Sequence, residues 1–201
     1  AAPDKYNRNA WDDDETNDEQ WPYRVKFSGT DLLGNVTIPE GDPTDVETSL
    51  EVSLDASSES YPLHTFNLLN DGVMEKIAKA FKLQPSEIAG ATLDAGTVKA
   101  DGFSGPAEGK VAVGLTNPDG KVSYAYSANG IGFWIAADGT ASSWGDAPIY
   151  YEYDASGYGL TVGHNPGHSE KGKTYTIKPT MVYNKGGKLH KAVITIKMKF
   201  A

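Results

Sequence analysis

The chain has 201 residues, a formal net charge of −9 at pH 7 and no cysteine. The lack of cysteine excludes disulfide bonds, thiolate metal sites and a cysteine nucleophile. The acidic balance argues against nucleic-acid and anionic-membrane surfaces, because both are bound through clustered Lys and Arg. The longest apolar run, IGFWIAA, is far shorter than the roughly twenty residues that span a bilayer.

Residues 1–20 contain few apolar side chains and include the acidic run DDDETNDE at 12–19. Such a segment cannot bury enough surface to offset the entropy lost on ordering, so we predict an acidic flexible tether. Calcium binding is the alternative interpretation. An EF-hand loop needs spaced ligands, a central Gly and a late Glu, and this run has none of that pattern.

Two alternating segments follow and predict half-buried strands, one over 23–27 and one over 50–54. The region between them is rich in Gly and Pro and has room for one short strand near 36–38. Two strands alone are only marginally stable in water. We therefore predict that they complete a single β-sandwich domain over residues 21–201.

Residues 71–89 hold a predicted pair of short helices. Val73, Met74, Ile77, Ala80 and Phe81 recur at helical spacing, and Pro85 suits the first turn of a second helix. The pair resembles a DNA-binding helix-turn-helix, but its second helix carries no Arg and the rest of the chain is β. We predict that the pair packs on a sheet.

Short strands and tight turns alternate from Gly90 to the C-terminus. Turn residues 117–120 separate two alternating runs, Pro179 interrupts a strand and predicts an edge or a bulge, and the final strand over 192–200 places alternate apolar residues inward. This spacing predicts a mainly β fold, an antiparallel β-sandwich or a partly closed barrel, with the helical pair on it.

Many of the chain's aromatic residues lie between 124 and 168, around the turn at Asp138-Gly139. Asp-Gly between two alternating runs favours a two-residue type I′ hairpin. That register would place Phe133 opposite Trp144 and Trp134 opposite Ser143. Phe133, Ile135 and Trp144 would then share the core face.

No local catalytic motif is present: there is no nucleophile elbow, phosphate-binding Gly-rich loop or zinc-protease helix. His164 and His168 have a metal-like spacing, but the Asn-Pro-Gly sequence between them rules out a shared helical face. Asp146, Glu152 and Asp154 could form the carboxyl pair of a glycosidase, or could be solvated strand-end and turn acids. We therefore predict no catalytic residue, no metal and no cofactor.

The aromatic region is the strongest functional signal. Flat aromatic rings stack on the C–H faces of sugars, and the sugar hydroxyls need polar partners. Strand alternation places Trp134 and Tyr150 out of phase with the core face, so either residue could be an exposed platform or an ordinary surface aromatic. The candidate ligand-binding residues are Trp134, Tyr150, Trp144, Tyr153, Asn129, Asp146 and Asn165.

The runs IAKAFKLQPSEIAGA, FWIAADGTASSWGD and WGDAPIYYEYDASGYGLTVGHNPGHSEKGKTYTIKPTMVY resemble a domain of unknown function, DUF4859, found in secreted and surface-lipoprotein chains of Bacteroidetes. The likeness covers about residues 63–200. It implies a β-rich extracytoplasmic module in chains associated with glycan capture and breakdown. It also implies a lipid-anchored N-terminus. Because the sequence has no Cys, two interpretations remain: the anchor residue has been removed, or the chain is secreted.

The sequence and the resemblance together predict a non-catalytic extracytoplasmic carbohydrate-binding module. Its partner would be a polysaccharide or oligosaccharide, at the outer-membrane surface or in the periplasm, with no nucleic acid. Membrane contact would occur only through an N-terminal lipid anchor. The alternatives are a glycoside-active enzyme and a structural or adhesive module that contacts an envelope protein.

Overall fold

The clearest alternation in the sequence forms the longest strand, β13 (Lys188–Phe200). Ala192, Ile194, Ile196, Met198 and Phe200 are buried along it, as predicted. A strand with one face buried in this way needs hydrogen-bonded neighbours on its edges and a second layer over its apolar face. Both are present.

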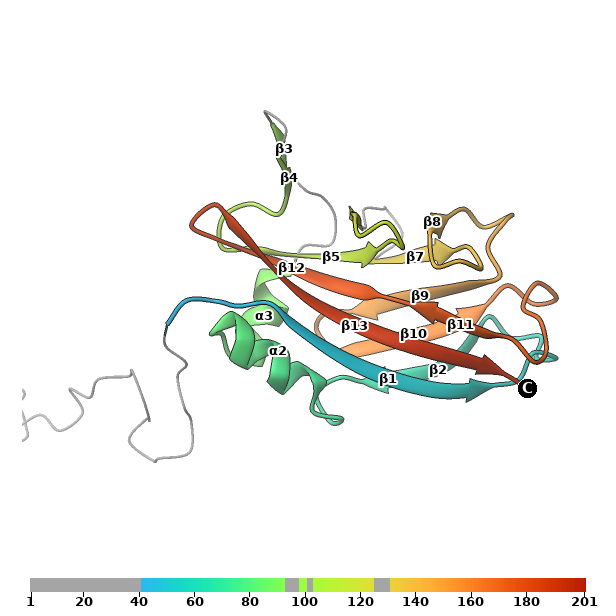
Figure 1. Cartoon of the computed structure of the whole chain (residues 1–201). Coiled ribbons are helices and arrows are strands. Elements are labelled where there is room, and N and C mark those ends of the chain that lie inside the picture. Colours follow the sequence, from blue (N-terminus) through green and yellow to red (C-terminus); the bar gives the residue numbers. More distant parts are fainter. Residues whose placement is uncertain (1–40, 93–97, 101–102, 125–130) are drawn as a thin grey trace, which may run out of the picture. The chain divides into compact units, whose positions relative to one another are not determined.

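The computed structural model describes residues 41–92, 98–100, 103–124 and 131–201. Within them two sheets face each other, as Figure 1 shows. The first has the order β1-β13-β12-β5-β6, and β11 also pairs with β13. Its other strands are β1 (Val46–Leu54), β5 (Val111–Thr116), β6 (Val122–Tyr124), β11 (Thr174–Ile177) and β12 (Pro179–Lys185).

The second sheet has the order β2-β10-β9-β7-β8. These strands are β2 (Pro62–Asn67), β7 (Ile131–Ile135), β8 (Ala141–Ser142), β9 (Ile149–Asp154) and β10 (Gly159–His164). A separate two-stranded ribbon consists of β3 (Val98–Ala100) and β4 (Phe103–Gly105). The strands pair antiparallel except β1 and β13, which run parallel. The predicted mainly β sandwich is confirmed, and the described strands do not close into a barrel.

The strand predicted over 50–54 is part of β1 and belongs to the first sheet. The acidic run at 12–19 and the strands predicted at 23–27 and near 36–38 lie outside the described residues.

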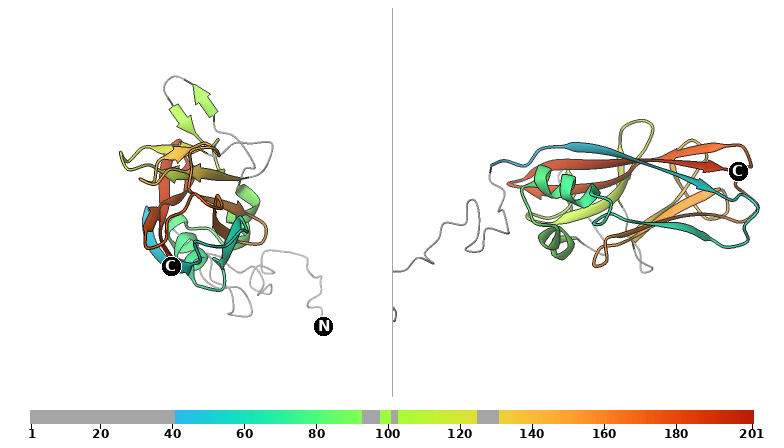
Figure 2. Two further views of the ribbon diagram at one scale, coloured as in Figure 1. Left: turned by 90° about the vertical axis from the view of Figure 1, so that its right-hand side faces the viewer. Right: turned by 90° about the horizontal axis from the view of Figure 1, so that it is seen from below.

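Two short helices occur where the sequence predicts them, α2 (Val73–Phe81) and α3 (Pro85–Ala91). Asp71 Oδ1 accepts a hydrogen bond from the amide of Val73, which satisfies one of the free donors of the first turn. Glu87 Oε1 does the same for the amide of Gln84 ahead of α3. The apolar face of α2 packs toward β1 and β13 at one end of the sandwich (Figures 1 and 2).

The core lies between the two sheets. Fully buried side chains from both layers meet there, among them Leu115, Ile135, Ile149, Tyr151, Ile177 and Ile194. The Tyr151 hydroxyl donates a hydrogen bond of 2.5 Å to the carbonyl oxygen of Gly114, and so joins β9 of one sheet to β5 of the other. A buried phenol needs such a partner, because burying an unpaired hydroxyl is costly.

Pro179 lies where the ladder to β13 is interrupted, and the predicted edge or bulge is wrong. Strand β12 lies between β13 and β5, and the pairs on both sides of the interruption keep the same register. On β13, Ile196 pairs with Ile177 of β11 and Val193 pairs with Thr180 of β12. The residues between these pairs have no ladder partner in β13, and Pro179 occupies that interval. A residue without an amide hydrogen fits there because no hydrogen bond to β13 is required.

The turn at Asp138-Gly139 differs from the prediction. The amide of Ala136 donates to the carbonyl of Thr140, and Gly139 has φ of 95° while Asp138 does not adopt a positive φ. This is a three-residue loop in which only the Gly is left-handed. The predicted type I′ turn is therefore wrong. Asp138 Oδ1 accepts from the amide of Thr140, which stabilises the longer loop.

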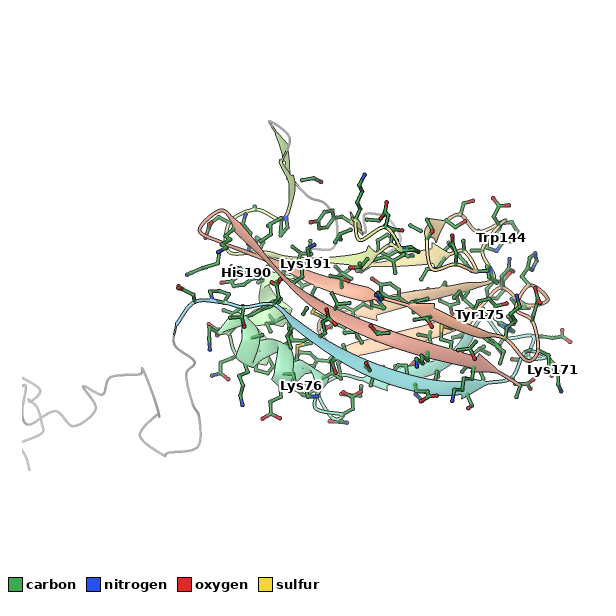
Figure 3. The ribbon with its side chains drawn as sticks, viewed as in Figure 1. Lys76, Trp144, Lys171, Tyr175, His190 and Lys191 are labelled. Carbon is green, nitrogen blue, oxygen red and sulfur yellow. The ribbon has the colours of Figure 1, made fainter. Side chains whose placement is uncertain are left out.

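The extra loop residue shifts the register by one position. Trp134 pairs with Ser142 rather than Ser143, and β8 ends at Ser142. Trp144 consequently lies beyond the strand with 58% of its surface exposed. Figure 3 shows it at the end of β8, pointing away from the ribbon. The predicted core position of Trp144 is wrong, because it assumed that β8 continued.

The buried tyrosines predict how stability depends on pH. Burial raises the pKa of Tyr151 well above its ordinary value of 10.0 and raises the pKa of Tyr153 as well. Because the unfolded chain ionises first, the stabilisation is fully present below about pH 10 and is lost as the pH rises further. Chemical unfolding followed across alkaline pH should show this decline.

The variant Tyr151→Phe separates this effect from general alkaline damage. It should lower the free energy of unfolding at neutral pH by about 1–2 kcal/mol, because the Gly114 carbonyl loses its partner. It should also make the alkaline decline shallower. A decline as steep in the variant as in the wild type would contradict the assignment to Tyr151.

Candidate functional site

The outer face of the second sheet carries an aromatic row that runs across its strands. Trp134 of β7 is the cross-strand partner of Tyr150 of β9, and Tyr150 is the partner of Gly163 of β10. Tyr61, just ahead of β2, contacts the Trp134 ring edge-on with the centroids 6.2 Å apart. We call Trp134, Tyr150 and Tyr61 the aromatic row.

Within this row Tyr150 is a support, and the accessible rings are those of Trp134 and Tyr61. An added methyl group at Gly163 would come to 2.5 Å from the Tyr150 ring, so that ring lies directly against the glycine backbone. Trp134 leans over Tyr150 with the centroids 4.9 Å apart. Tyr150 is therefore only 5% exposed, and the possibility that it is an exposed platform is wrong. Trp134 is half-buried.

A polar row lies beside the aromatic row. Glu152 of β9 pairs with Gly132 of β7 on one side and with Thr161 of β10 on the other, and Thr161 pairs with Thr65 of β2. The hydroxyls of Thr65 and Thr161 are hydrogen-bonded at 2.8 Å. We call Glu152, Thr161 and Thr65 the polar row. On β9, Glu152 of the polar row is two residues from Tyr150 of the aromatic row, a spacing of about 7 Å.

Trp134 and Tyr150 of the aromatic row and Glu152 and Thr161 of the polar row line a cleft of about 380 Å³. This volume is within the range of small-molecule sites. The residues that line it are Ile131, Gly132, Phe133, Trp134, Tyr150, Tyr151, Glu152, Tyr153, Asp154, Gly159 and Thr161. The three strands β7, β9 and β10 supply all of them, so the cleft stands on rigid elements.

Charge in the cleft comes from Glu152 and Asp154. The Ser156 hydroxyl, followed by the amide of Gly157, lowers the pKa of Asp154 through hydrogen bonds. Burial, followed by the negative charge of Glu152, raises the pKa of Tyr150 to about 12. Near neutral pH the cleft therefore holds an ionised Asp154 and a protonated Tyr150 phenol, which remains a hydrogen-bond donor.

The structure brings only some of the predicted ligand-binding residues together. Trp134 and Tyr150 lie in the cleft. Tyr153 also borders it, but its side chain is 6% exposed and belongs to the core, where it lines a small internal cavity together with Val113 and Met181 of the first sheet. Asn129 lies outside the described residues.

Trp144 and Asp146 lie elsewhere, in the turn between β8 and β9, and Asn165, which follows β10, contacts that turn. The buried Asn165 side chain donates to the Trp144 carbonyl at 3.2 Å, and the main-chain amide of Asn165 donates to the Pro148 carbonyl. The Asp146 carboxylate lies 3.5 Å from the Ser143 hydroxyl. Asn165 thus anchors the turn as a structural residue, and these three side chains do not line the cleft.

The acidic residues considered for catalysis do not form one group. Glu152 and Asp154 lie on the same face of β9 at the cleft, whereas Asp146 lies in the turn after β8. Asp154 Oδ1 accepts from the Ser156 amide and hydroxyl, so it closes the turn into β10. A glycosidase general acid needs a raised pKa, and that of Asp154 is lowered.

The two histidines of the Asn-Pro-Gly segment have separate environments. His164 is fully buried, where its Nδ1 lies 2.7 Å from the Ser169 hydroxyl and its Nε2 lies 3.0 Å from the Ser58 carbonyl. His168 is exposed. Within the described ranges, no three His, Cys, Asp or Glu side chains are grouped so that they could hold a metal ion.

Several cleft residues escaped sequence analysis. Thr161, which lines the cleft, and its hydrogen-bonded neighbour Thr65 were missed because 96 residues separate them in the chain, although β2 and β10 are neighbours in the sheet. Gly132 and Gly163 are the residues in the sequence that could have indicated this site. Both fall at outward positions of strands, where a missing side chain leaves room for a neighbouring ring or for a ligand.

No helix in the described part of the chain has the length and apolar character needed to cross a membrane.

Comparison with known proteins gives two family matches. The model of DUF4859, a domain of unknown function, matches residues 60–188, which include β2 and every strand of the cleft. The model of DUF6055, a family of unknown function, matches residues 1–34. No curated protein and no solved structure matches the chain.

The contact between Gly163 and Tyr150 predicts a sharp effect of one methyl group. In Gly163→Ala the new Cβ would overlap the Tyr61 carbonyl oxygen and the Tyr150 ring. Because neither the backbone nor a packed ring can move freely, the variant should lose about 1–3 kcal/mol of unfolding free energy in a denaturant titration.

Gly90→Ala is the matched control. Nothing lies within 4 Å of a Cβ added at Gly90, which is inside α3. Its stability should stay the same or rise by about 0.5–1 kcal/mol. Equal stability of the Gly163→Ala variant and the wild type would show that the aromatic row is not packed as described.

Proposed function

We propose that this chain, which belongs to the DUF4859 family of domains of unknown function, is a non-catalytic module that binds a polysaccharide or oligosaccharide in the cleft of its second sheet. One observation carries the proposal. An aromatic row and a polar row lie about 7 Å apart on one rigid sheet face, and a sugar presents an apolar face and hydroxyl edges at comparable separation.

The contacts divide between the two rows. Trp134 is half-buried and held by Tyr150, so it offers a fixed ring face at little entropic cost. Glu152 is exposed and accepts hydrogen bonds, while the Thr65 and Thr161 hydroxyls share one hydrogen bond and keep one proton for a ligand. A sugar ring stacked on Trp134 would therefore find both acceptors and a donor beside it.

A binding role is better supported than catalysis. A glycosidase needs two carboxyl groups with separate acid and base roles. The second carboxylate of the cleft, Asp154, is engaged by Ser156 and has a lowered pKa. Asp154 is therefore unsuited to the general-acid role, and its carboxylate is occupied in closing the turn into β10.

The proposed cellular setting rests on the family resemblance alone. In that setting the module would be part of a polysaccharide capture and utilisation system of a Bacteroidetes-like bacterium. It would act outside the cytoplasm, at the outer-membrane surface or in the periplasm, on a secreted or lipid-anchored chain.

Trp134→Ala tests the proposal directly. Affinity gel electrophoresis against a panel of soluble polysaccharides should show retention of the wild type by at least one of them. The variant should bind that polysaccharide at least tenfold more weakly, because losing a central aromatic contact typically costs about 2 kcal/mol or more. Near-UV circular dichroism and a denaturant titration would check that the variant is folded.

Trp144→Ala is the control, because it removes an exposed Trp that does not line the cleft. It should bind as the wild type does. Retention that survives in Trp134→Ala would remove the cleft as the site. Sugar release that disappears in Glu152→Gln would assign an enzyme, and a stable complex with an envelope protein in place of any glycan would assign an adhesive module.

A further inference from the structure

The charge of the cleft narrows the class of glycan that fits it. Among the residues described as lining the cleft, Glu152 and Asp154 carry charge and none is Lys, Arg or His. An ionised carboxylate only accepts hydrogen bonds. The lining therefore complements hydroxyl groups and offers no positive charge to an acidic sugar.

Glu152 lies at the β9 end of the polar row, and it forms no ion pair with another described residue. It lies between Gly132, which has no side chain to cover it, and Thr161. The ion pairs within the described residues are Lys173 with Glu170 and Lys199 with Glu51, and both lie on elements other than the cleft strands. A ligand at the polar row thus meets a negative charge with which no Lys, Arg or His in the described part of the chain is paired.

We propose, on the basis of the carbohydrate-binding function above, that the cleft selects glycans without carboxylate or sulfate groups and that Glu152 is the residue that excludes acidic ones. A hydroxyl pair of a neutral sugar can donate to the two oxygens of Glu152. A uronate or sulfate at the same place brings two negative groups together at a partly enclosed surface, where like charges repel strongly.

The test compares neutral and acidic polysaccharides in one affinity gel series. The neutral set is soluble β-glucan, xylan and galactomannan, and the acidic set is polygalacturonate, alginate and heparin. The wild type should be retained by at least one neutral polymer and at least tenfold less by every acidic one. Retention by an acidic polymer as strong as by any neutral one would overturn the proposal.

Charge reversal at Glu152 tests the residue itself. Glu152→Lys should gain at least tenfold in retention by one or more acidic polymers. The control Glu47→Lys makes the same change in net charge at an exposed position of β1, on the other sheet, and should gain much less. An equal gain in both variants would show that overall charge, and not Glu152, excludes acidic glycans.

These outcomes are separable from failure of the proposed function. Retention of the wild type by acidic polymers alone would keep carbohydrate binding and overturn the selectivity. A lack of retention by every polymer, neutral and acidic, would overturn both.

Discussion

The first half of strand β9, Ile149 to Tyr151, is buried on both of its faces, and this constraint organises the second sheet. Its inward residues, Ile149, Tyr151 and Tyr153, pack in the core, and Tyr151 also bonds to the opposite sheet. Outward, Tyr150 is covered by Trp134 and rests on Gly163. The strand is therefore fixed from both sides, and the candidate site stands on the outer of these two contacts.

The fold could be predicted where buried residues recur at the regular spacing of a strand or a helix. The alternation along β13 and β1 and the helical spacing of α2 each depend on residues a few positions apart, which the sequence shows directly. The turn at Asp138 failed because Asp-Gly suits both a two-residue turn and a three-residue loop with one left-handed Gly. The one extra residue in the loop shifted the register, so Trp144 lies in an exposed turn and not at the predicted core position.

The candidate site could be predicted only in part. Strand alternation placed Trp134 and Tyr150 on the face opposite the core, and the structure confirms that they are cross-strand partners on that face. Strand alternation could not reveal that the lack of a side chain at Gly163 lets the Tyr150 ring lie buried against the backbone. Nor could it reveal that β2 brings Thr65 next to Thr161. Both facts depend on the order of strands in the sheet, and that order is a property of the whole chain.

The parallel pairing of β1 with β13 has a consequence for how the domain forms. Asp45 accepts a hydrogen bond from the Lys191 amide, 146 residues further along the chain. Contacts of such sequence separation slow folding, because a long loop must close before they stabilise anything. Among the described strands β1 pairs with β13 alone, so during synthesis this pairing has to wait until β13 has been made. Its outward Glu47 and Glu51 would then serve as charged gatekeepers against pairing with other chains.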